Sequence, residues 1–254
     1  MNSKIALVTG ASAGFGKAIV AQLIEDGFSV IGAARRLEKL QALEELYGKE
    51  NFLALPMDVS NPKEIDLALT KIPKEWQSID LLINNAGLAL GLDKAFEADF
   101  ANWMTMINTN IIGLTYLTHQ LLPDMVKRNS GMIINMGSTA GTIPYPGANI
   151  YGASKAFVKQ FSLNLRADLA GTKIRVTNIE PGLCEGTEFS NVRFKGDRDR
   201  VEAIYKGANA IQAKDIANTV SWIVNQPPHV NINRIEIMPV SQSYGPQPVS
   251  REDV

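Results

Sequence analysis

The alternation of short apolar runs with longer amphipathic segments constrains the fold of this chain more than any other feature. Strands that alternate with helices form right-handed crossovers, which give a mostly parallel sheet covered by helices on both faces. The sequence therefore predicts an α/β fold, a single doubly wound parallel sheet of about seven strands. The predicted strands are residues 5–9, 29–33, 52–56, 81–84, 132–135, 175–179 and 234–237, and the predicted helices are residues 16–26, 37–47, 62–72, 100–128, 151–169 and 214–225.

The domain organisation is simple. No change in composition and no Gly/Ser linker divides the 254 residues, a length at the upper end of the single-domain range. Hydrophobic residues make up 45% of the chain and charged residues 20%, as in ordinary globular proteins. We predict one domain over residues 1–245 and a loosely held tail over residues 246–254, which are rich in proline and polar side chains.

Charge and composition exclude several classes of protein. The net charge of −1 gives no field that attracts nucleic acid or an anionic membrane. No secretory signal and no apolar stretch of about 20 residues is evident, so we expect no membrane association. A single cysteine, Cys184, fits a reducing compartment, and the predicted location is the cytoplasm. His119 and His229 are far apart and lack a cluster of further ligands, so no metal site is expected.

A glycine-rich loop follows the first predicted strand and leads into a helix. Its glycines have the spacing Gly-x3-Gly-x-Gly. Such glycines permit a tight turn and let the backbone approach a pyrophosphate at a helix N-terminus. An ordinary strand-to-helix turn also uses glycine, but the position at the first strand–helix junction favours a Rossmann-type dinucleotide site. The loop residues assigned to cofactor binding are Gly10, Ser12, Gly14, Phe15 and Gly16.

The end of the second predicted strand selects the nucleotide. Sites for NAD place an acidic residue there, which binds the ribose 2′-hydroxyl. This chain has Ala34, followed by Arg35 and Arg36. Guanidinium groups bind a 2′-phosphate through charge-assisted hydrogen bonds, so we predict NADP(H) as the cofactor. The alternative is that both arginines are solvated residues at a helix start, where a positive charge opposes the helix dipole.

Three residues in the middle of the chain have the chemistry of a proton donor and its partners. Tyr151 and Lys155 are four residues apart on one helix face, and Ser138 follows a buried strand. A hydride transfer to a carbonyl leaves an alkoxide, which needs a proton. We expect the ammonium of Lys155, with the positive nicotinamide ring, to lower the pKa of Tyr151 from about 10. Ser138 can donate a hydrogen bond to the substrate oxygen.

Over nearly its whole length the sequence resembles the short-chain dehydrogenase/reductase superfamily. The matching residues are 9–16, Asp58, Val59, 84–87, Asn110, Ser138, Tyr151, Lys155, Pro181 and Gly182. The resemblance implies that Asp58 and Val59 border the adenine, that Asn85, Ala86 and Gly87 support the nucleotide, that Asn110 orders a relay water, and that Pro181 and Gly182 flank the nicotinamide. It also implies a homotetramer or homodimer. Thr187, expected to meet the carboxamide, stands six residues after the proline instead of five.

Further segments resemble the NADP-dependent 3-hydroxy acid dehydrogenase group, which includes serine dehydrogenases, malonic semialdehyde reductases and sulfoacetaldehyde reductases. They are residues 84–92, 137–141, 180–183, 186–197 and 229–244. The resemblance implies a small substrate that carries an acid group. We expect Arg193 to bind that anion, with Tyr244 as a further donor from this chain or a neighbouring subunit. The alternative for Arg193 is an ion pair with Glu188 or Asp197.

The sequence thus predicts an NADP(H)-dependent oxidoreductase that interconverts a small acid-bearing aldehyde or ketone and its hydroxy form. Two alternatives stay open. A non-catalytic NADP sensor would use the glycine loop but has no need of Asn110, Ser138, Tyr151 and Lys155 together. An epimerase or dehydratase on the same fold would show no stoichiometric change in NADPH absorbance.

Overall fold

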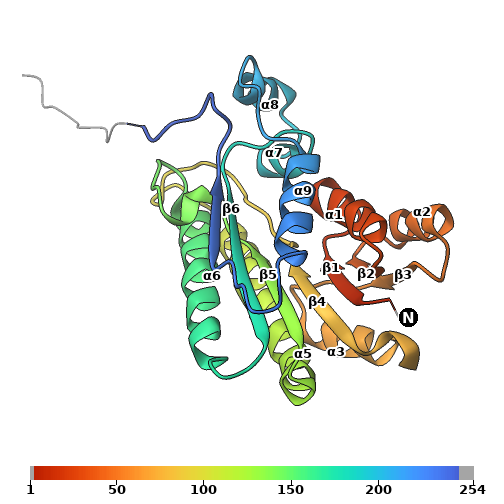
Figure 1. Ribbon diagram of the computed structural model, residues 1–254. Helices are drawn as coiled ribbons and strands as arrows, with labels where there is room; N and C mark the ends of the chain where they lie inside the picture. Colours follow the sequence, from red (N-terminus) through yellow and green to blue (C-terminus); the bar gives the residue numbers. More distant parts are fainter. Residues whose placement is uncertain (1–2, 246–254) are drawn as a thin grey trace, which may run out of the picture.

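The computed structural model describes residues 3–245, so the predicted tail at 246–254 lies outside the described residues. Within 3–245 the chain forms one sheet of seven parallel strands in the order β3-β2-β1-β4-β5-β6-β7 (Figure 1). The predicted doubly wound α/β fold is therefore confirmed. The strands are β1 (Ile5–Thr9), β2 (Ser29–Ala34), β3 (Phe52–Pro56), β4 (Ile79–Asn84), β5 (Gly131–Met136), β6 (Ile174–Pro181) and β7 (Arg234–Ile237).

Helices cover both faces of the sheet. Buried side chains of α1, α2 and α9 form one core on one face, and those of α3, α5 and α6 form a second core on the other (Figure 1). The helices are α1 (Gly14–Glu25), α2 (Leu37–Tyr47), α3 (Pro62–Thr70), α4 (Phe100–Ile107), α5 (Leu114–Arg128), α6 (Asn149–Asp168), α7 (Phe189–Arg193), α8 (Arg198–Tyr205) and α9 (Ala213–Val224), with short turns η1 (Lys74–Trp76), η2 (Asn108–Gly113) and η3 (Thr139–Gly141).

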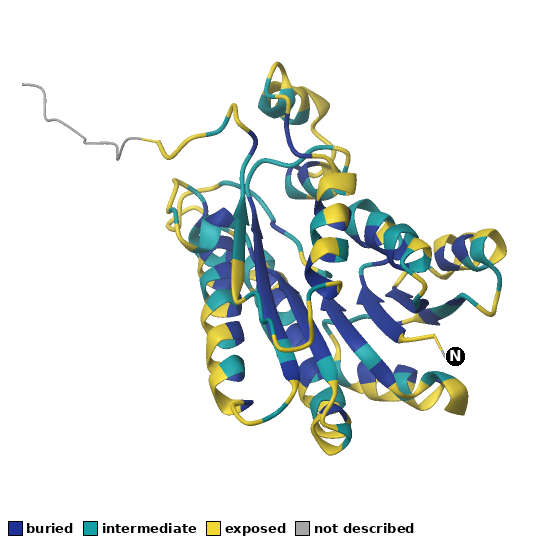
Figure 2. Cartoon of the chain, viewed as in Figure 1, coloured by how far each residue is buried: buried dark blue, intermediate teal, exposed yellow. Residues whose placement is uncertain are grey.

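The strands separate the two cores because successive side chains point to opposite faces. In β1, Ala6 and Val8 belong to the core under α1 and α9, whereas Ile5 and Leu7 belong to the core under α3 and α5. All five residues of β1 are buried, as a strand covered on both faces requires. Figure 2 shows the buried strands at the centre and the exposed residues on the outer faces of the helices.

Two elements differ from the prediction. The helix expected over 100–128 is interrupted by η2, a π-helical turn between α4 and α5. The wider turn carries Asn110, whose side chain is bonded outside its own helix to the backbone of Leu88. The segment after Gly182, in which no helix was predicted before residue 214, contains the short helices α7 and α8. No helix within residues 3–245 is long and apolar enough to cross a membrane.

The carboxyl ends of the parallel strands meet at one edge of the sheet. The strand order reverses between β1 and β4, the position at which doubly wound folds bind their ligands. A cavity of about 550 Å³ opens there. Its walls come from the segments that directly follow β1, β2, β3, β4, β5 and β6, and from the α7 region. Topology therefore brings together segments that are far apart in the sequence.

Candidate active site

The glycine loop forms one end of this cavity. Gly10 and Gly14 have positive φ angles of 68° and 51°, which favour glycine. A Cβ atom added to Gly10 would lie 2.8 Å from Nδ2 of Asn85, and one added to Gly14 would lie 3.1 Å from Cβ of Thr187. The hydroxyl of Thr9 accepts hydrogen bonds from the backbone N–H groups of Asn85 and Ala86, at 3.0 and 2.9 Å. The loop is thus a tight cradle, held against the segment that follows β4.

The two arginines after β2 have different surroundings. Arg35 lines the cavity, is exposed and makes no hydrogen bond with any residue between 3 and 245. Arg36 is half-buried and donates to Oγ of Ser12 from Nε and Nη2, at 3.3 and 3.0 Å. It also forms a two-bond pair with the carboxylate of Glu188, at 3.0 and 2.8 Å. Both guanidinium groups therefore lie at the end of the cavity where the prediction places the 2′-phosphate.

The remaining residues assigned to the cofactor line the same cavity. The Asp58 carboxylate accepts hydrogen bonds from the backbone N–H and the hydroxyl of Ser60, at 2.9 and 2.8 Å. The Thr187 hydroxyl accepts from the backbone N–H of Phe189 at 3.3 Å. The chemistry of this wall fits a dinucleotide with a 2′-phosphate, since a glycine cradle adjoins two arginines. The predicted cofactor residues in the wall are Gly10, Ser12, Gly14, Phe15, Arg35, Arg36, Asp58, Val59, Asn85, Ala86, Gly87, Tyr151, Lys155, Pro181, Gly182 and Thr187. Gly16 lies behind them, in the first turn of α1.

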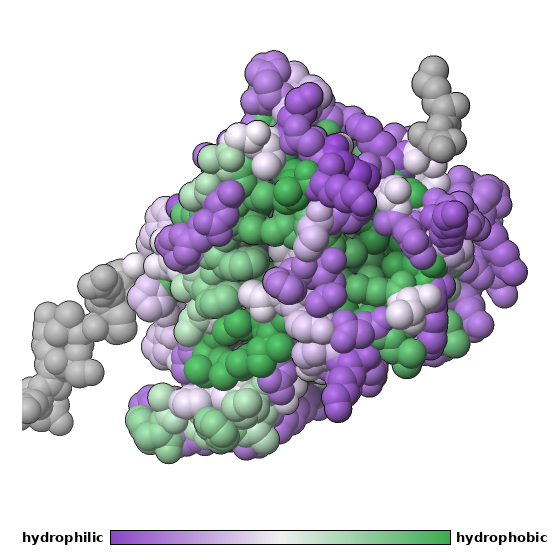
Figure 3. Space-filling model, turned by 90° about the horizontal axis from the view of Figure 1, so that it is seen from below, coloured by the Kyte–Doolittle hydropathy of each residue, from purple (hydrophilic) through white to green (hydrophobic). Residues whose placement is uncertain are grey.

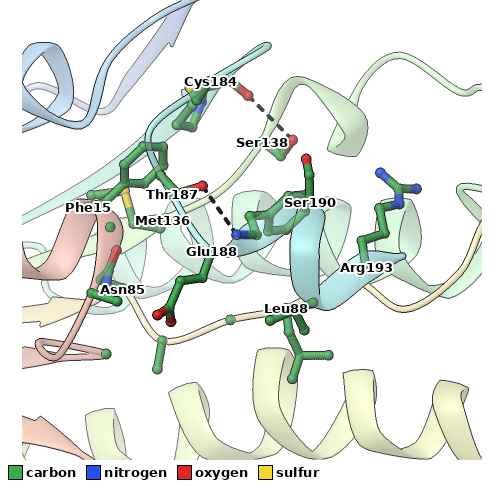
Figure 4. A pocket seen from close by; sticks show the side chains of 18 of the residues that line it. Phe15, Asn85, Leu88, Met136, Ser138, Cys184, Thr187, Glu188, Ser190 and Arg193 are labelled. Atoms are coloured by element: carbon green, nitrogen blue, oxygen red, sulfur yellow. Dashed lines mark hydrogen bonds between the residues drawn. The ribbon is translucent and has the colours of Figure 1, made fainter. Parts of the chain in front are cut away.

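Ser138, Tyr151 and Lys155 converge in the cavity wall at the carboxyl end of β5. Tyr151 and Lys155 are 8% and 7% exposed, and Nζ of Lys155 lies 5.9 Å from the ring centroid of Tyr151. Lys155 donates to the carbonyl oxygen of Met136 at 2.8 Å. The hydroxyl of Ser138 donates to the carbonyl oxygen of Pro181 at 3.4 Å (Figure 4). It accepts from the backbone N–H of Ala140 at 3.1 Å. These bonds fix the side chains of Ser138 and Lys155.

Burial controls the ionisation of this cluster. It raises the pKa of Tyr151 to about 12, although hydrogen bonding to Ser138 and the positive charge of Arg193 act in the opposite direction. Burial also lowers the pKa of Lys155 to about 8. Among the protein groups, burial therefore outweighs any lowering of the Tyr151 pKa by Lys155, and the expected effect of the positive nicotinamide ring stays a prediction. The physical reason is that burial disfavours the charged forms of both side chains.

Asn110 is 1% exposed and lies behind the cluster. Its amide donates to the carbonyl oxygen of Leu88 at 2.9 Å and to Oγ of Ser154 at 3.1 Å. Its Oδ1 accepts from the backbone N–H of Leu88 at 2.9 Å. A Cβ atom added to Gly87 would lie 3.2 Å from Oδ1 of Asn110 and 3.3 Å from Nζ of Lys155. Asn110 therefore links the segment after β4 to α6 beside the lysine.

Arg193 is the last residue of α7, and its side chain lies beside the ring of Tyr151. Its Nε donates to the carbonyl oxygen of Gly91 and its Nη2 to the hydroxyl of Tyr145, both at 3.1 Å. The guanidinium carbon lies 5.5 Å from the ring centroid of Tyr145 and 5.6 Å from that of Tyr151. The alternative ion pair with Glu188 or Asp197 is wrong, because Glu188 binds Arg36 and Asp197 caps α8. Figure 4 shows Glu188 and Arg193 leaving their segment in different directions.

Tyr244 and Cys184 are the two remaining side chains to be placed. Tyr244 is exposed and its hydroxyl donates to the carboxylate of Glu236, outside the cavity wall. Tyr244 therefore does not line the cavity of its own chain, although Gln242 of the same segment does, and a donor role from a neighbouring subunit stays a prediction. Burial raises the pKa of Cys184 to about 12, so this thiol is not activated. Within residues 3–245 no group of three or more potential metal ligands is present.

Two contacts at this site were not predicted. One is the pair of Arg36 with Glu188, and the other is the pair of Arg193 with Tyr145. Tyr145 carried no signal, because it stands in a loop and has no partner nearby in the sequence. Glu188 was considered only as a partner for Arg193. The charge of Arg36 was the sole hint of a carboxylate partner 152 residues away.

The fold and the site together define a class. A doubly wound sheet with a glycine cradle at its switch point, and a buried Ser–Tyr–Lys cluster on the nicotinamide side of the predicted cofactor path, defines a dinucleotide-dependent oxidoreductase. The family described as short chain dehydrogenase matches residues 4–198. The chain belongs to this family.

Known proteins resemble it over almost all of its length. A probable NADP-dependent dehydrogenase of Haemophilus influenzae is 56% identical over 99% of this chain and 100% of its own. The NADP-dependent 3-hydroxy acid dehydrogenase YdfG of Escherichia coli K12 is 53% identical over 98% of this chain and 100% of its own. The closed form of a serine dehydrogenase complexed with NADP⁺ is 53% identical, covers 98% of this chain and 100% of its own, and has a TM-score of 0.96.

Proposed function

We propose that this short-chain dehydrogenase uses NADP(H) to interconvert a small acid-bearing 3-hydroxy compound and the corresponding aldehyde or ketone. The convergence of Ser138, Tyr151 and Lys155 at one wall of the cavity carries the proposal. The names of relatives that are 53% identical over nearly the full length support the NADP-dependent dehydrogenase activity and the hydroxy acid class. A serine-type 3-hydroxy acid or 3-hydroxypropionate fits this class, and isethionate is the sulfonate counterpart.

Proton transfer is the task of the protein in this reaction. Bound NADPH supplies the hydride, and NADP⁺ accepts it in the reverse direction. The Tyr151 hydroxyl donates its proton to the developing alkoxide, a role suited to a phenol that burial keeps protonated. Ser138 donates a hydrogen bond to the same oxygen. Lys155 and Asn110 both lie beside Gly87 in the segment after β4, and a water held there by Asn110 would bring the replacement proton toward Tyr151.

Cofactor selection rests on charge in this proposal. Arg35 and Arg36 bind the 2′-phosphate through charge-assisted hydrogen bonds, and the second strand offers no acid to hold a free 2′-hydroxyl. The glycine cradle receives the pyrophosphate at the N-terminus of α1. Asp58 and Val59 border the adenine, while Pro181, Gly182 and Thr187 line the nicotinamide end.

The acid group of the substrate has one charged partner in the proposed site. Arg193 lies beside the Tyr151 ring, and its guanidinium group is oriented by Gly91 and Tyr145. A guanidinium group can bind a carboxylate or a sulfonate with two hydrogen bonds. A small anion offers little apolar area, so its binding depends mainly on such bonds. The spacing from Tyr151 to Arg193 therefore favours short substrates.

The test is a screen of NADPH oxidation with malonic semialdehyde, sulfoacetaldehyde and succinic semialdehyde, and of NADP⁺ reduction with serine and 3-hydroxypropionate. We expect turnover with the shorter carboxylates or the sulfonate, and stoichiometric change in the 340 nm absorbance. The absence of any absorbance change with substrates that are nevertheless consumed would favour an epimerase or dehydratase. Binding of NADPH without turnover of any compound would favour the sensor alternative.

A further inference from the structure

A short segment after β4 connects several of the groups assigned to the reaction. Residues 88–93, here called the strap, begin in the cavity wall at Leu88, whose backbone exchanges two hydrogen bonds with the side chain of Asn110. Further along the strap, the backbone N–H of Gly91 donates to the carbonyl oxygen of Arg193 at 3.0 Å, and the carbonyl oxygen of Gly91 accepts from Nε of Arg193 at 3.1 Å. The strap therefore joins the residue assigned to the relay water to the residue assigned to the substrate anion.

The far end of the strap rests on the residues that precede the proton donor. Gly147 has a φ angle of 78°, and a Cβ atom added to it would overlap the carbonyl oxygen of Leu92. Nδ2 of Asn149 donates to the carbonyl oxygen of Asp93 at 3.0 Å. Asn149 is the first residue of α6 and stands two residues before Tyr151. The same strap that holds Arg193 is therefore fastened to the start of the helix that carries Tyr151.

The backbone of Asn149 shows that this fastening has a conformational cost. Its φ angle is 21°, at the border of the left-handed region that side chains other than asparagine and aspartate rarely adopt. Its Oδ1 accepts from the backbone N–H of Ile150 at 2.7 Å, while its Nδ2 donates to the strap. A sparsely populated backbone conformation persists when the surrounding bonds hold it. Both ends of the amide thus serve one purpose, which is to join the strap to the start of α6.

Tyr151 and Arg193 need a fixed separation if one small substrate is to contact both. The guanidinium carbon of Arg193 lies 5.6 Å from the centroid of the Tyr151 ring. Arg193 is bonded to the strap at Gly91, and the start of α6 is bonded to the strap at Asp93. Because both helices are tied to one short segment, a shift of that segment would change the distance between the proton donor and the anion site.

We propose that Asn149 is a positioning residue that sets the length of the substrate. The inference rests on the proposed function, in which Tyr151 donates the proton and Arg193 binds the acid group. By fastening the strap to α6, Asn149 holds Arg193 at the distance that suits an acid group one methylene away from the carbonyl. Without this bond the strap shifts, and the preference for the short acid weakens. Asn149 is not among the described residues that line the cavity, so it acts through the strap and not by contact with substrate.

Steady-state reduction of malonic semialdehyde and succinic semialdehyde with NADPH tests the proposal, since the two anions differ by one methylene. Asn149→Gly leaves the backbone conformation accessible and removes both side-chain bonds. Its KM for malonic semialdehyde should rise with little change in kcat, and kcat/KM should fall about two- to tenfold, the factor that corresponds to a typical hydrogen bond. The kcat/KM for succinic semialdehyde should stay nearly unchanged. An unchanged ratio of the two kcat/KM values would overturn the proposal.

Two further variants separate positioning from a general loss of structure. Asn149→Asp keeps the oxygen that accepts from Ile150 but places a second oxygen against the carbonyl of Asp93, so it should narrow the ratio at least as much as Asn149→Gly. Asn129→Gly is the matched control. Asn129 caps α5 with a φ angle of 48°, and its Oδ1 accepts from the backbone N–H of Lys173 at 2.9 Å, outside the cavity wall. A narrower ratio in Asn129→Gly, or an unchanged one in Asn149→Asp, would contradict the proposal.

A neutral aldehyde distinguishes this inference from the function on which it rests. Propanal has no acid group, so its reduction does not depend on the distance to Arg193, and Asn149→Gly should leave its kcat/KM nearly unchanged. An equal fall for propanal and malonic semialdehyde would mean that Asn149 only supports Tyr151, which refutes its role in substrate length and leaves the proposed function standing. If the wild type reduced neither acid-bearing aldehyde, the proposed function would fail and the inference with it.

Discussion

Lys155 lies one helical turn after Tyr151, and its Nζ atom is 5.9 Å from the centroid of the phenol ring. Both side chains are buried at the edge of the cavity. The lysine donates to Met136 and not to the tyrosine, so the pair interacts through space and not through a direct hydrogen bond. The shared burial displaces the two pKa values in opposite directions, the phenol upward and the ammonium downward. This has consequences for stability that can be measured.

The stability of the protein should rise with pH where Lys155 titrates. Below pH 8 the lysine is protonated in both states, so the folded state carries the full cost of burying its charge. Between pH 8 and 10.5 the folded lysine is neutral while the unfolded one stays protonated, and stability increases by up to about 3 kcal/mol. Urea denaturation between pH 7.5 and 9.5 should show a steeper rise for the wild type than for Lys155→Met. Parallel curves would contradict the displaced pKa.

Above pH 10 the tyrosine should act in the opposite direction. The unfolded phenol ionises near pH 10, whereas the folded one keeps its proton to about pH 12. The folded state then binds more protons than the unfolded state, so stability falls with pH in this window. Tyr151→Phe should remove that contribution, which is seen as a shallower decline in urea midpoint between pH 10 and 11. An unchanged decline would show that Tyr151 ionises normally.

Tyr151→Phe also tests the proton donor. The variant keeps the ring that packs against Phe189 and removes only the hydroxyl. Turnover should fall by roughly 10²–10⁴, the usual contribution of general acid–base catalysis. Binding of NADPH, followed by its fluorescence, should persist. A variant that keeps more than a tenth of wild-type turnover would exclude Tyr151 as the donor.

Arg35→Ala tests whether Arg35 binds the 2′-phosphate of the cofactor. Arg35 has no competing partner among residues 3–245. Each charged hydrogen bond that it makes to the phosphate should therefore contribute its whole free energy to NADPH binding. We expect NADPH binding to weaken by about 1.5–3 kcal/mol per bond lost, while NADH binding changes little. Arg36→Ala should cost less, because it also releases Glu188. Equal losses for the two cofactors would show that Arg35 does not contact the phosphate.

The strands and helices of the sheet could be predicted because their signals are local. The strands β1 to β7 coincide with the short runs that were predicted as strands, and the paired arginines stand directly after β2. Ser138, Tyr151 and Lys155 lie within 18 residues, and strand-end geometry brings them together. The π-helical turn at Asn110 depends on a bond to Leu88 from another segment, and the Arg36–Glu188 pair spans 152 residues. Neither leaves a periodic pattern, so the sequence alone could not predict them.

The homotetramer or homodimer stays a prediction, and α6 offers a way to test it. Phe157 and Leu163 are both 40% exposed, whereas Leu165 is buried in the core, so α6 has apolar side chains that do not face the sheet. Figure 3 shows hydrophobic residues interspersed with hydrophilic ones on the face seen from below. We expect sedimentation of the wild type as a dimer or tetramer at micromolar concentration, and a lighter species for Phe157→Glu. A monomeric wild type would refute the prediction.

The final prediction concerns the anion site. Arg193→Met keeps much of the packing of the stem between Tyr145 and Tyr151 but deletes the guanidinium group. For acid-bearing substrates kcat/KM should fall. The fall should correspond to a loss of roughly 2–4 kcal/mol in transition-state binding, the scale of a few lost charged hydrogen bonds. A neutral aldehyde of similar size should lose far less. Tyr145→Phe is the matched control, because it removes only the hydroxyl that orients Arg193 and should have a smaller effect of the same selectivity. If kcat/KM falls equally for anionic and neutral substrates, Arg193 only orders the segment that carries α7 and α8, and the anion binds elsewhere.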